Sequence, residues 1–415
     1  MVHPDSSAAA AMSPAKHADA GCVEVVALQP VAVVDHLGRP VSKDFLNRNV
    51  AIGGHELGGS ERVDPQELAS LLSKLEADGT DTRVVTKAGG SAANTARGLS
   101  RGFGVRAGLL GAVGDDQWGN LFKQAMRDAR VDVSNLSEKP GATGRCACFV
   151  EEGSGQRTMR TCMQDAVRLE AREILGRLGD RDDEVVGSNP LRGASWVLVP
   201  GYAFYGAGLV DALLLAAAEA NCEVALALSS FEIVRSFGRE IERLLRSGRI
   251  AAVFANEDEA RELSKYAERT RLDEAESSDR SKKKRKAQSG PMDSSPETAA
   301  EDALDVLQRW SKECVAVVTL GDKGCVARRW DPYSQTRVSC GAEDIVAQDS
   351  TGAGDLFVSG FLYGLLRGAL LDECAELGCL AGAAATQSVG AEVSDEGWAW
   401  VRDRRYSSGL VSFEQ

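Results

Sequence analysis

Histidine is nearly missing from this 415-residue sequence. The four histidines are His3, His17, His36 and His55, so all of them precede residue 56. A catalytic histidine dyad or a histidine-rich metal centre deeper in the chain is therefore excluded. Chemistry in the rest of the chain has to depend on carboxylates, backbone amides and cationic side chains.

Cysteine pairs at metal or redox spacing are missing as well. The ten cysteines are scattered without a C-x-x-C motif. The closest pair, Cys146 and Cys148, would lie on one face of a strand, too far apart along it for an easy disulfide. Because no secretory signal opens the sequence, we interpret these cysteines as free thiols in a reducing compartment and expect a cytoplasmic protein.

Long apolar runs and a surplus of positive charge are two further absences. The longest uncharged stretch, Gly193–Val210, contains Pro200 and Gly201, so it indicates strand, turn and helix start and not a membrane span. The net charge of −13 argues against nucleic acid as the main ligand, because phosphate backbones are bound by basic surfaces. With 43% hydrophobic and 26% charged residues, the composition is typical of a globular protein.

Two segments are set apart by their composition. Residues 1–21 are rich in alanine and serine and predict a disordered tail, with an organelle transit peptide as the alternative. Tyr266–Asp302 is charge-dense with almost no large apolar residues, which predicts a flexible insertion. Within it, Lys282–Lys286 is interpreted as solvated loop, with a nuclear address or an anion-binding patch as alternatives. One domain over 22–415 remains.

Short apolar runs alternate with helical patterns along this domain. We expect a first buried strand over Val23–Val34, ending at Asp35, and a helix over Leu209–Ala220. Two alternating segments, Gly141–Val150 and Gln156–Cys162, predict a hairpin. Strands that alternate with helices indicate parallel βαβ units. The remaining expected elements are strands over Val105–Val113, Trp196–Val199, Val224–Leu228, Ile250–Ala255 and Val315–Leu320, and helices over Pro65–Leu75, Ser91–Leu99, Gln117–Arg127, Ala303–Ser311 and Leu371–Ser388.

The most informative stretch is D-S-T-G-A-G-D, Asp349–Asp355, which stands directly before the apolar run Leu356–Leu366. Such a run after a glycine turn predicts a helix whose first N–H groups are free to bind an anion, most naturally a phosphate. A carboxylate inside a phosphate cradle would be repelled unless it had a chemical role. Phosphoryl transfer to an alcohol provides one, because Asp355 can take the hydroxyl proton while the amides hold the transferred charge. The plain alternative is an aspartate that only caps the helix.

This string resembles the C-terminal signature of the PfkB (ribokinase-like) family of sugar and nucleoside kinases. A second stretch, A-G-G-S-A-A-N-T-A-R-G-L at Ala88–Leu99, followed by Gly111–Gly119, resembles the family's N-terminal signature, in a form closer to adenosine kinases. The resemblance covers roughly Val23–Trp400 and implies a three-layer α/β/α sandwich with a mostly parallel sheet and a small β-lid. We expect lid elements within about 36–87 and 141–163.

The resemblance also implies roles for individual residues. Catalysis falls to Asp355 as base, with Gly352, Ala353 and Gly354 as the anion hole. Asn256 and Glu259, in an N-x-x-E motif, would organise Mg²⁺, with a capped helix start as the alternative. The acceptor would be held by Asp35, Gly89, Gly90, Ser91 and Asn94, with a glycine turn and a buried, satisfied asparagine as the alternative for Asn94. Arg157 or Arg160 would lie near the acceptor or the γ-phosphate, with an arginine facing solvent as the alternative for at least one of them. ATP would be held by Thr319, Gly321, Gly324 and Thr351.

The expected activity is transfer of the ATP γ-phosphoryl group to a primary hydroxyl of a nucleoside or sugar. Alternatives are a kinase for fructose or ribose, and a degenerate family member that acts as a regulatory or scaffold protein. ATP and Mg²⁺ are the implied cofactors, with a monovalent cation such as K⁺ near Gly390-Ala391. The implied partner is a small molecule, and the protein would be a monomer or a homodimer.

Overall fold

The computed structural model describes residues 22–51, 57, 59–77, 83–153, 157–178, 189–278, 295–330, 335–341, 345 and 347–407. The predicted N-terminal tail and the basic run Lys282–Lys286 lie outside these residues. The strands are β1 Val25–Gln29, β2 Val33–Val41, β3 Ser60–Arg62, β4 Arg83–Gly89, β5 Ala107–Gly114, β6 Asp132–Lys139, β7 Gly144–Glu151, β8 Arg157–Cys162, β9 Trp196–Pro200, β10 Glu223–Ala227, β11 Ala252–Asn256, β12 Val315–Thr319, β13 Cys325–Trp330 and β14 Gln335–Cys340. The helices are α1 Lys43–Asn49, α2 Pro65–Ala77, α3 Ser91–Arg97, α4 Gln117–Asp128, α5 Ala171–Leu178, α6 Leu209–Ala220, α7 Phe231–Arg246, α8 Glu257–Ser278, α9 Pro296–Trp310, α10 Ala353–Leu366, α11 Leu371–Thr386 and α12 Asp395–Ser407.

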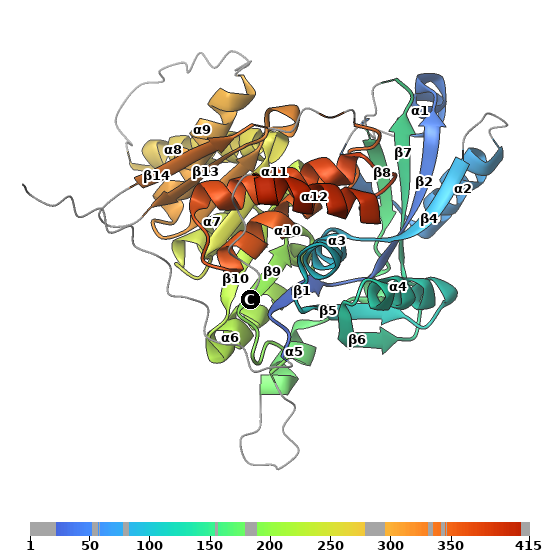
Figure 1. Cartoon of the computed structure of the whole chain (residues 1–415), viewed down its shortest axis with the longest axis horizontal. Coiled ribbons are helices and arrows are strands. Elements are labelled where there is room, and N and C mark those ends of the chain that lie inside the picture. Colours follow the sequence, from blue (N-terminus) through green and yellow to red (C-terminus); the bar gives the residue numbers. More distant parts are fainter. Residues whose placement is uncertain are drawn as a thin grey trace, which may run out of the picture.

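A nine-stranded sheet forms the centre of the molecule, in the order β14-β13-β12-β11-β10-β9-β1-β5-β6. All neighbours from β6 to β12 pair in parallel, and only β13 and β14 run antiparallel to their neighbours. Parallel strands require crossover connections, and the helices between them supply these (Figure 1). The predicted parallel α/β sheet is confirmed.

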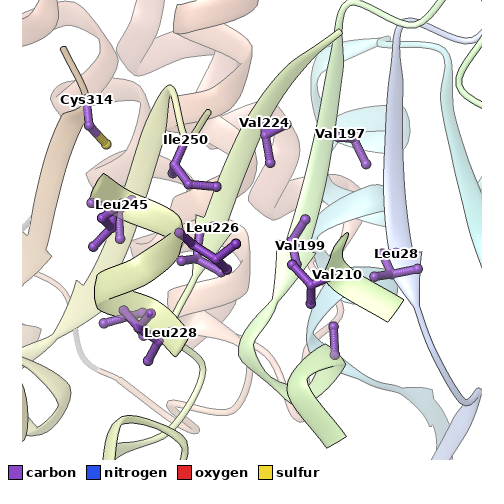
Figure 2. Packing of buried hydrophobic residues seen from close by; sticks show 14 of the residues in the cluster. Leu28, Val197, Val199, Val210, Val224, Leu226, Leu228, Leu245, Ile250 and Cys314 are labelled. Atoms are coloured by element: carbon purple, nitrogen blue, oxygen red, sulfur yellow. The ribbon is translucent and has the colours of Figure 1, made fainter. Parts of the chain in front are cut away.

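Helices cover both faces of this large sheet, because side chains alternate along each strand. Val197 and Val199 of β9, with Val224 and Leu226 of β10, pack on one side against α6 and α7 (Figure 2). Trp196 belongs to the core on the opposite side, where α3, α4, α10 and α11 lie. Strands buried on both faces read as continuous apolar runs, which is why they could be located from sequence. The architecture is a three-layer α/β/α sandwich.

A second, smaller sheet has the order β3-β8-β7-β2-β4. Ala147 and Phe149 of β7 pack on its outer face with helices α1 and α2. The intervening Cys146 belongs to a separate cluster on the inner face, with Val33 and Met163. The predicted hairpin is confirmed, since β7 and β8 pair antiparallel. The strands of this sheet fall within or close to the two regions from which lid elements were expected.

The chain passes between the two sheets four times, and three of the passages contact the short connection Pro30–Ala32 or its neighbour Gln29. These contacts come from segments far apart in the sequence, so the chain passages between the two sheets meet in one small region. They are the bonds from Leu169 N–H to the Pro30 carbonyl (2.8 Å), from Gly144 N–H to the Ala32 carbonyl (3.0 Å) and from Ala93 N–H to the Gln29 side-chain oxygen (3.1 Å).

The prediction of one strand over Val23–Val34 was wrong. The chain forms β1 in the large sheet, bends at Pro30–Ala32 and begins β2 in the small sheet. Proline lacks an N–H for a strand ladder, and here it marks the break inside an unbroken apolar run. Asp35 therefore lies within β2 and not at the end of the first parallel strand.

The predicted insertion over Tyr266–Asp302 was wrong at both ends. Helix α8 continues to Ser278, and α9 begins at Pro296, earlier than the predicted Ala303. Tyr266 packs edge-on against Trp310, with ring centres 5.9 Å apart, and the Ser295 hydroxyl caps α9. The many charged residues concealed these helices, because one apolar residue in each turn is enough to bury a narrow face of a helix.

Other local predictions are confirmed. The helix over Leu209–Ala220 has the predicted bounds, and α2 and α4 differ from their predictions by a residue or two. All ten cysteines are free thiols. Within the described residues, no helix combines the length and apolar character needed to cross a bilayer.

Candidate active site

A cavity of about 260 Å³ lies between one end of the large sheet and the inner face of the small sheet. Residues at the carboxyl ends of β9, β10, β11 and β12 line it, which is the edge at which open α/β sheets bind ligands. The start of α10 lines it as well. Predicted site residues among its lining are Asp35, Gly90, Ser91, Asn94, Arg157, Asn256, Glu259, Thr319, Thr351, Gly352, Gly354 and Asp355.

Helix α10 begins directly after the glycine turn, as predicted. Gly352 precedes it with φ of +75°, a left-handed conformation that favours glycine. A side chain at Gly352 would stand 2.2 Å from the Cβ of Ala391. The buried Asp349 fixes the turn, since its carboxylate accepts from Thr351 N–H (2.9 Å), Thr351 Oγ1 (2.6 Å) and Gly390 N–H (2.9 Å). These three hydrogen bonds fix the conformation of the turn.

The first turn of α10 leaves backbone donors available at the cavity. Ala353 N–H bonds the Ser350 carbonyl at 3.3 Å. The N–H groups of Gly354 and Asp355 belong to the first turn, where a helix offers no intrahelical acceptor. Gly354 is exposed, and a Cβ on it would meet no atom within 4 Å. A phosphate can therefore approach this backbone without steric hindrance.

Asp355 stands beside these donors with both carboxylate oxygens held. Ser91 Oγ donates to Oδ1 at 2.7 Å, and Asn94 Nδ2 donates to Oδ2 at 2.8 Å. Burial raises the pKa of Asp355, while these two hydrogen bonds and the charges of Arg157 and Arg97 act to lower it. Each oxygen keeps a further lone pair for a hydroxyl proton. The group has the position and the hydrogen bonding expected of a general base.

Asn94 is buried and satisfied within the protein. Its Nδ2 reaches Asp355, and its Oδ1 accepts from Arg97. These contacts match the alternative of a satisfied core asparagine, although the residue also lines the cavity. A direct contact between Asn94 and an acceptor hydroxyl stays a prediction.

The glycine pair before α3 makes room for side chains. A Cβ on Gly89 would lie 2.0 Å from Oδ2 of Asp35, and one on Gly90 would lie 2.6 Å from Nε2 of Gln29. Gly90 also has φ of +93°. The glycines were expected to admit a ligand, but the space beside Gly89 is filled by the Asp35 carboxylate. Gly89 is not among the residues that line the cavity, and its role in acceptor binding stays a prediction.

Asp35 reaches the cavity from the small sheet, even though its strand was mispredicted. Burial raises the pKa of Asp35 to about 7, against the opposing effect of Arg97, and the charge of Asp355 raises it further. Burial of a carboxylate favours its neutral form. Asp35 on β2 of the small sheet and Asp355 at the start of α10 are thus two carboxyl groups that line one cavity.

The raised pKa of Asp35 predicts a pH-dependent stability. The folded protein holds this proton up to about pH 7, whereas the unfolded chain releases it near the ordinary value of 3.8, so this group's contribution to stability falls as pH rises between them. We expect Asp35→Asn to raise the free energy of unfolding by about 1–2 kcal/mol more at pH 8 than at pH 5. Urea unfolding at both values, with the exposed Asp211→Asn as control, measures this. An equal effect at both values would contradict it.

The two arginines that were considered for the acceptor lie on opposite faces of strand β8. Arg157, Met159 and Thr161 line the cavity. Arg160 points to the other face, fully buried, and donates to the carbonyls of Met159 and Val50. The alternatives of Arg160 near the acceptor or in solvent were both wrong, because side chains alternate along a strand.

Asn256 and Glu259 form a reciprocal cap at the start of α8. Asn256 N–H and Nδ2 donate to the two Glu259 oxygens at 2.9 and 3.0 Å, and Glu259 N–H donates to Asn256 Oδ1 at 2.9 Å. Burial raises the pKa of Glu259 to about 8. The capped helix start is therefore present, and it holds a buried carboxylate at the cavity wall. No cluster of three metal-ligating acids, histidines or cysteines occurs in the described part of the chain.

Only two of the four residues predicted to bind ATP line the cavity. Thr319 and Thr351 line the cavity, but Gly321 and Gly324 are not among its lining residues. Both glycines have positive φ, at +59° and +83°, and shape the turn after β12. Their contact with ATP stays a prediction.

Several residues around the cavity were missed. Gln29 is the last residue of β1, and its side chain binds the Val31 carbonyl and Ala93 N–H. A polar residue at the end of an apolar strand could have indicated its place at the site. Arg97 interrupts a helix of small residues, which was a signal too. Glu392 gave none. The ends of β9 and β10 add Tyr202, Tyr205, Ser229, Ser230 and Glu232 to the lining.

Comparison with known proteins decides which family this site belongs to. The sequence profile described as pfkB family carbohydrate kinase matches residues 61–397. The chain belongs to the pfkB family. The fold of this pfkB chain is ribokinase-like, and the chain is a kinase of this family.

Individual relatives refine the placement. This pfkB chain is 29% identical over 303 residues to an adenosine kinase of Schizophyllum commune, covering 71% of the chain and 78% of that protein. It is 37% identical over 94 residues to an uncharacterized sugar kinase of Archaeoglobus fulgidus, but covers only 34% of its length. The structure of adenosine kinase from Sinorhizobium meliloti superposes with a TM-score of 0.70 at 28% identity, covering 92% of this chain and 99% of that one.

Proposed function

We propose that this pfkB-family kinase transfers the γ-phosphoryl group of ATP to a primary hydroxyl of a nucleoside. The observation that carries the proposal is the Asp355 carboxylate, held by Ser91 and Asn94 next to the open first turn of α10. A base and an anion-binding helix start at one point are what transfer to an alcohol requires.

The reaction follows from this arrangement. The acceptor hydroxyl oxygen bonds to the γ-phosphorus as the bond from that phosphorus to the bridging oxygen of ADP breaks, and the hydroxyl proton passes to Asp355. The N–H groups of Gly354 and Asp355 hold the charge of the moving phosphoryl group. Arg157, whose charge reaches both Asp35 and Asp355, adds a cation on the opposite wall. Catalysis thus depends on positioning and electrostatic stabilisation.

A nucleoside is favoured over a free sugar by the walls of the cavity. Val33, Cys146 and Met163 form an apolar cluster on the inner face of the small sheet, with Met159 packed against it. Tyr202 and Tyr205 of the 3₁₀ turn Gly201–Tyr205 line the cavity too. A flat nucleobase gains from such walls, whereas a free sugar presents hydroxyls on every side. The similarity to adenosine kinases supports the same choice.

A free sugar is the second candidate, favoured by the polar part of the lining. Ser60, Ser229, Ser230 and Glu232 could bond several hydroxyl groups. An ADP-release assay with ATP and Mg²⁺ across adenosine, cytidine, guanosine, ribose and fructose separates the two. We expect the highest kcat/KM with a nucleoside. A higher value for a free sugar would contradict the nucleoside assignment, and activity with none would contradict kinase function on these acceptors.

Residues suited to the implied Mg²⁺ are present. Glu259 places a buried carboxylate in the cavity, and Mg²⁺ keeps several waters and needs few protein carboxylates when phosphates share its coordination. Glu259, backed by Asn256, would hold the ion through its waters, and the ion would neutralise phosphate charge. A K⁺ site near Gly390 stays a prediction. The Lys87 ammonium lies at this turn, 3.1 Å from the Val389 carbonyl.

The Mg²⁺ assignment gives a sharp prediction. Glu259→Gln keeps the length of the side chain but replaces one accepting oxygen with an NH₂ group, which removes the carboxylate and one of its two bonds from Asn256. We therefore expect the Mg²⁺ concentration for half-maximal activity to rise about tenfold. Asp258→Asn, at an exposed neighbouring acid on the same helix, is the matched control and should not change it. Equal Mg²⁺ curves for Glu259→Gln and the unmodified protein would rule out this role for Glu259.

A further inference from the structure

A buried arginine side chain bonds Asn94, one of the two residues that hold the proposed base Asp355. Arg97 on α3 is 6% exposed. It donates from Nη1 to Glu392 at 2.8 Å and from Nη2 to the Ala88 carbonyl at 3.0 Å and to Asn94 Oδ1. Its Nε has no hydrogen-bond partner among the described residues. The proposed transfer reaction does not by itself account for this group.

The contact between Arg97 and Asn94 determines which way the asparagine amide faces. A guanidinium can only donate hydrogen bonds, so the amide oxygen has to face Arg97. The amide nitrogen then faces Asp355 and donates to Oδ2 at 2.8 Å. With the amide reversed, its oxygen would face a carboxylate oxygen and repel it. Arg97 and ionised Asp355 thereby favour the same orientation of the Asn94 amide, and Arg97 maintains that orientation when Asp355 is protonated.

We propose that Arg97 and Glu392 are positioning residues for Asp355, which fix the Asn94 amide so that it holds the base ionised and in place. The proposal rests on the proposed function, since it names residues that serve the same transfer. Neither residue needs to touch ATP or the acceptor.

Glu392 keeps Arg97 in place and ties it to the small sheet. Its Oε1 accepts from Arg97 at 2.8 Å, and its Oε2 accepts from Lys87 Nζ at 2.7 Å. Burial acts to raise the pKa of Glu392, but Arg97 and Lys87 outweigh it and lower the pKa. Glu392 thus stays charged and completes a chain of contacts from β4 through α3 to the base.

A stabilising role alone explains this ion pair poorly. The Arg97 side chain is 8% exposed and that of Glu392 42%, so the cost of removing charge from water falls mainly on the guanidinium, while a half-exposed pair adds little stability in return. The unpartnered Nε adds to that penalty. The arrangement is best explained by what it does for Asn94 and Asp355.

The test is the titration of Asp355 in variants at position 97. The charged groups that face Asp355 are Arg97 on α3, Arg157 on β8, Asp35 on β2 and Glu259 on α8. Arg97→Met removes one of these cations and releases the Asn94 amide, and both changes act to raise the pKa of Asp355. Arg97→Lys keeps a donor and a charge. Carbon-13 NMR of labelled aspartate, with the signal assigned through Asp355→Asn, follows this carboxyl without any turnover.

We expect Arg97→Met to move the Asp355 titration and the acid limb of kcat/KM upward by about one pH unit. It should also lower kcat about thirtyfold, with little change in KM for ATP. Arg97→Lys should recover most of both effects. Arg367→Met is the matched control, because it breaks an Arg–Glu pair with Glu24, at the end of β1 away from the cavity, and should leave both titrations unchanged.

An unmoved Asp355 titration in Arg97→Met would overturn the proposal, even if turnover fell. If Arg97→Met does not fold, Glu392→Gln tests the same link, with a smaller upward shift expected and no shift overturning it. Because the NMR readout needs no substrate, it tests this inference even if no acceptor on the panel is phosphorylated. That second result would count against the proposed function alone.

Discussion

Replacing Asp355 with asparagine is expected to lower kcat about a thousandfold, which is within the range for loss of a general base. The amide has nearly the same shape, so the cavity and the helix start remain. The amide cannot take the proton of an acceptor hydroxyl, and this is the cause of the expected loss of kcat. ATP affinity, measured by equilibrium titration, should change less than about threefold, because the N–H donors of the α10 start do not depend on this side chain.

Asp211→Asn is a matched control, since Asp211 also lies in the first turn of a helix, α6, and is paired at the surface with Arg243. It should leave kcat unchanged. Turnover in Asp355→Asn equal to that of the unmodified protein would remove Asp355 from the mechanism. A loss of ATP affinity as large as the loss of kcat would assign it to binding instead.

Gly354→Ala is expected to separate stability from activity. The added methyl group meets no atom within 4 Å, and alanine is favoured over glycine in a helix by about 0.5–1 kcal/mol, so the protein should unfold at a slightly higher temperature. Gly354 lines the cavity, and the proposed mechanism requires the phosphoryl group to approach the backbone at this residue. We therefore expect kcat/KM for ATP to fall about a hundredfold.

Gly176→Ala is the control, because Gly176 is a helical glycine in α5, also has open space around it, and is not a cavity residue. It should give a similar gain in stability with unchanged kinetics. Unchanged kinetics in Gly354→Ala would show that the phosphoryl group binds elsewhere. Gly352→Ala should differ from both, because overlap with Ala391 and the positive φ together cost about 2–5 kcal/mol.

The sequence was most informative where local rules suffice. The helix after Gly352 could be predicted because a glycine turn and an apolar run are adjacent in the chain. The buried strands of the large sheet could be predicted because both of their faces are apolar. Asp355 could be identified as a candidate site residue because a carboxylate in a turn suited to anions needs an explanation that other positions do not.

Contacts between distant segments could not be predicted in the same way. Nothing near Glu392 indicates that it meets Arg97, since 295 residues separate them. The break at Pro30 was hidden because the apolar run continues on both sides of it, while the two halves belong to different sheets. The failure at Arg160 was of another kind, since the alternation along β8 would have placed it opposite Arg157.

The convergence of the inter-sheet passages on Pro30–Ala32 has a mechanical consequence. Asp35 stands three residues beyond this connection, whereas Arg62 lies on β3, an edge strand of the small sheet, and its guanidinium rests 4.8 Å from the centre of the Tyr205 ring. Any rotation of the small sheet about the connection would therefore displace Arg62 more than Asp35. We expect an acceptor to enter where the contact between Arg62 and Tyr205 opens, while Asp35 keeps its place.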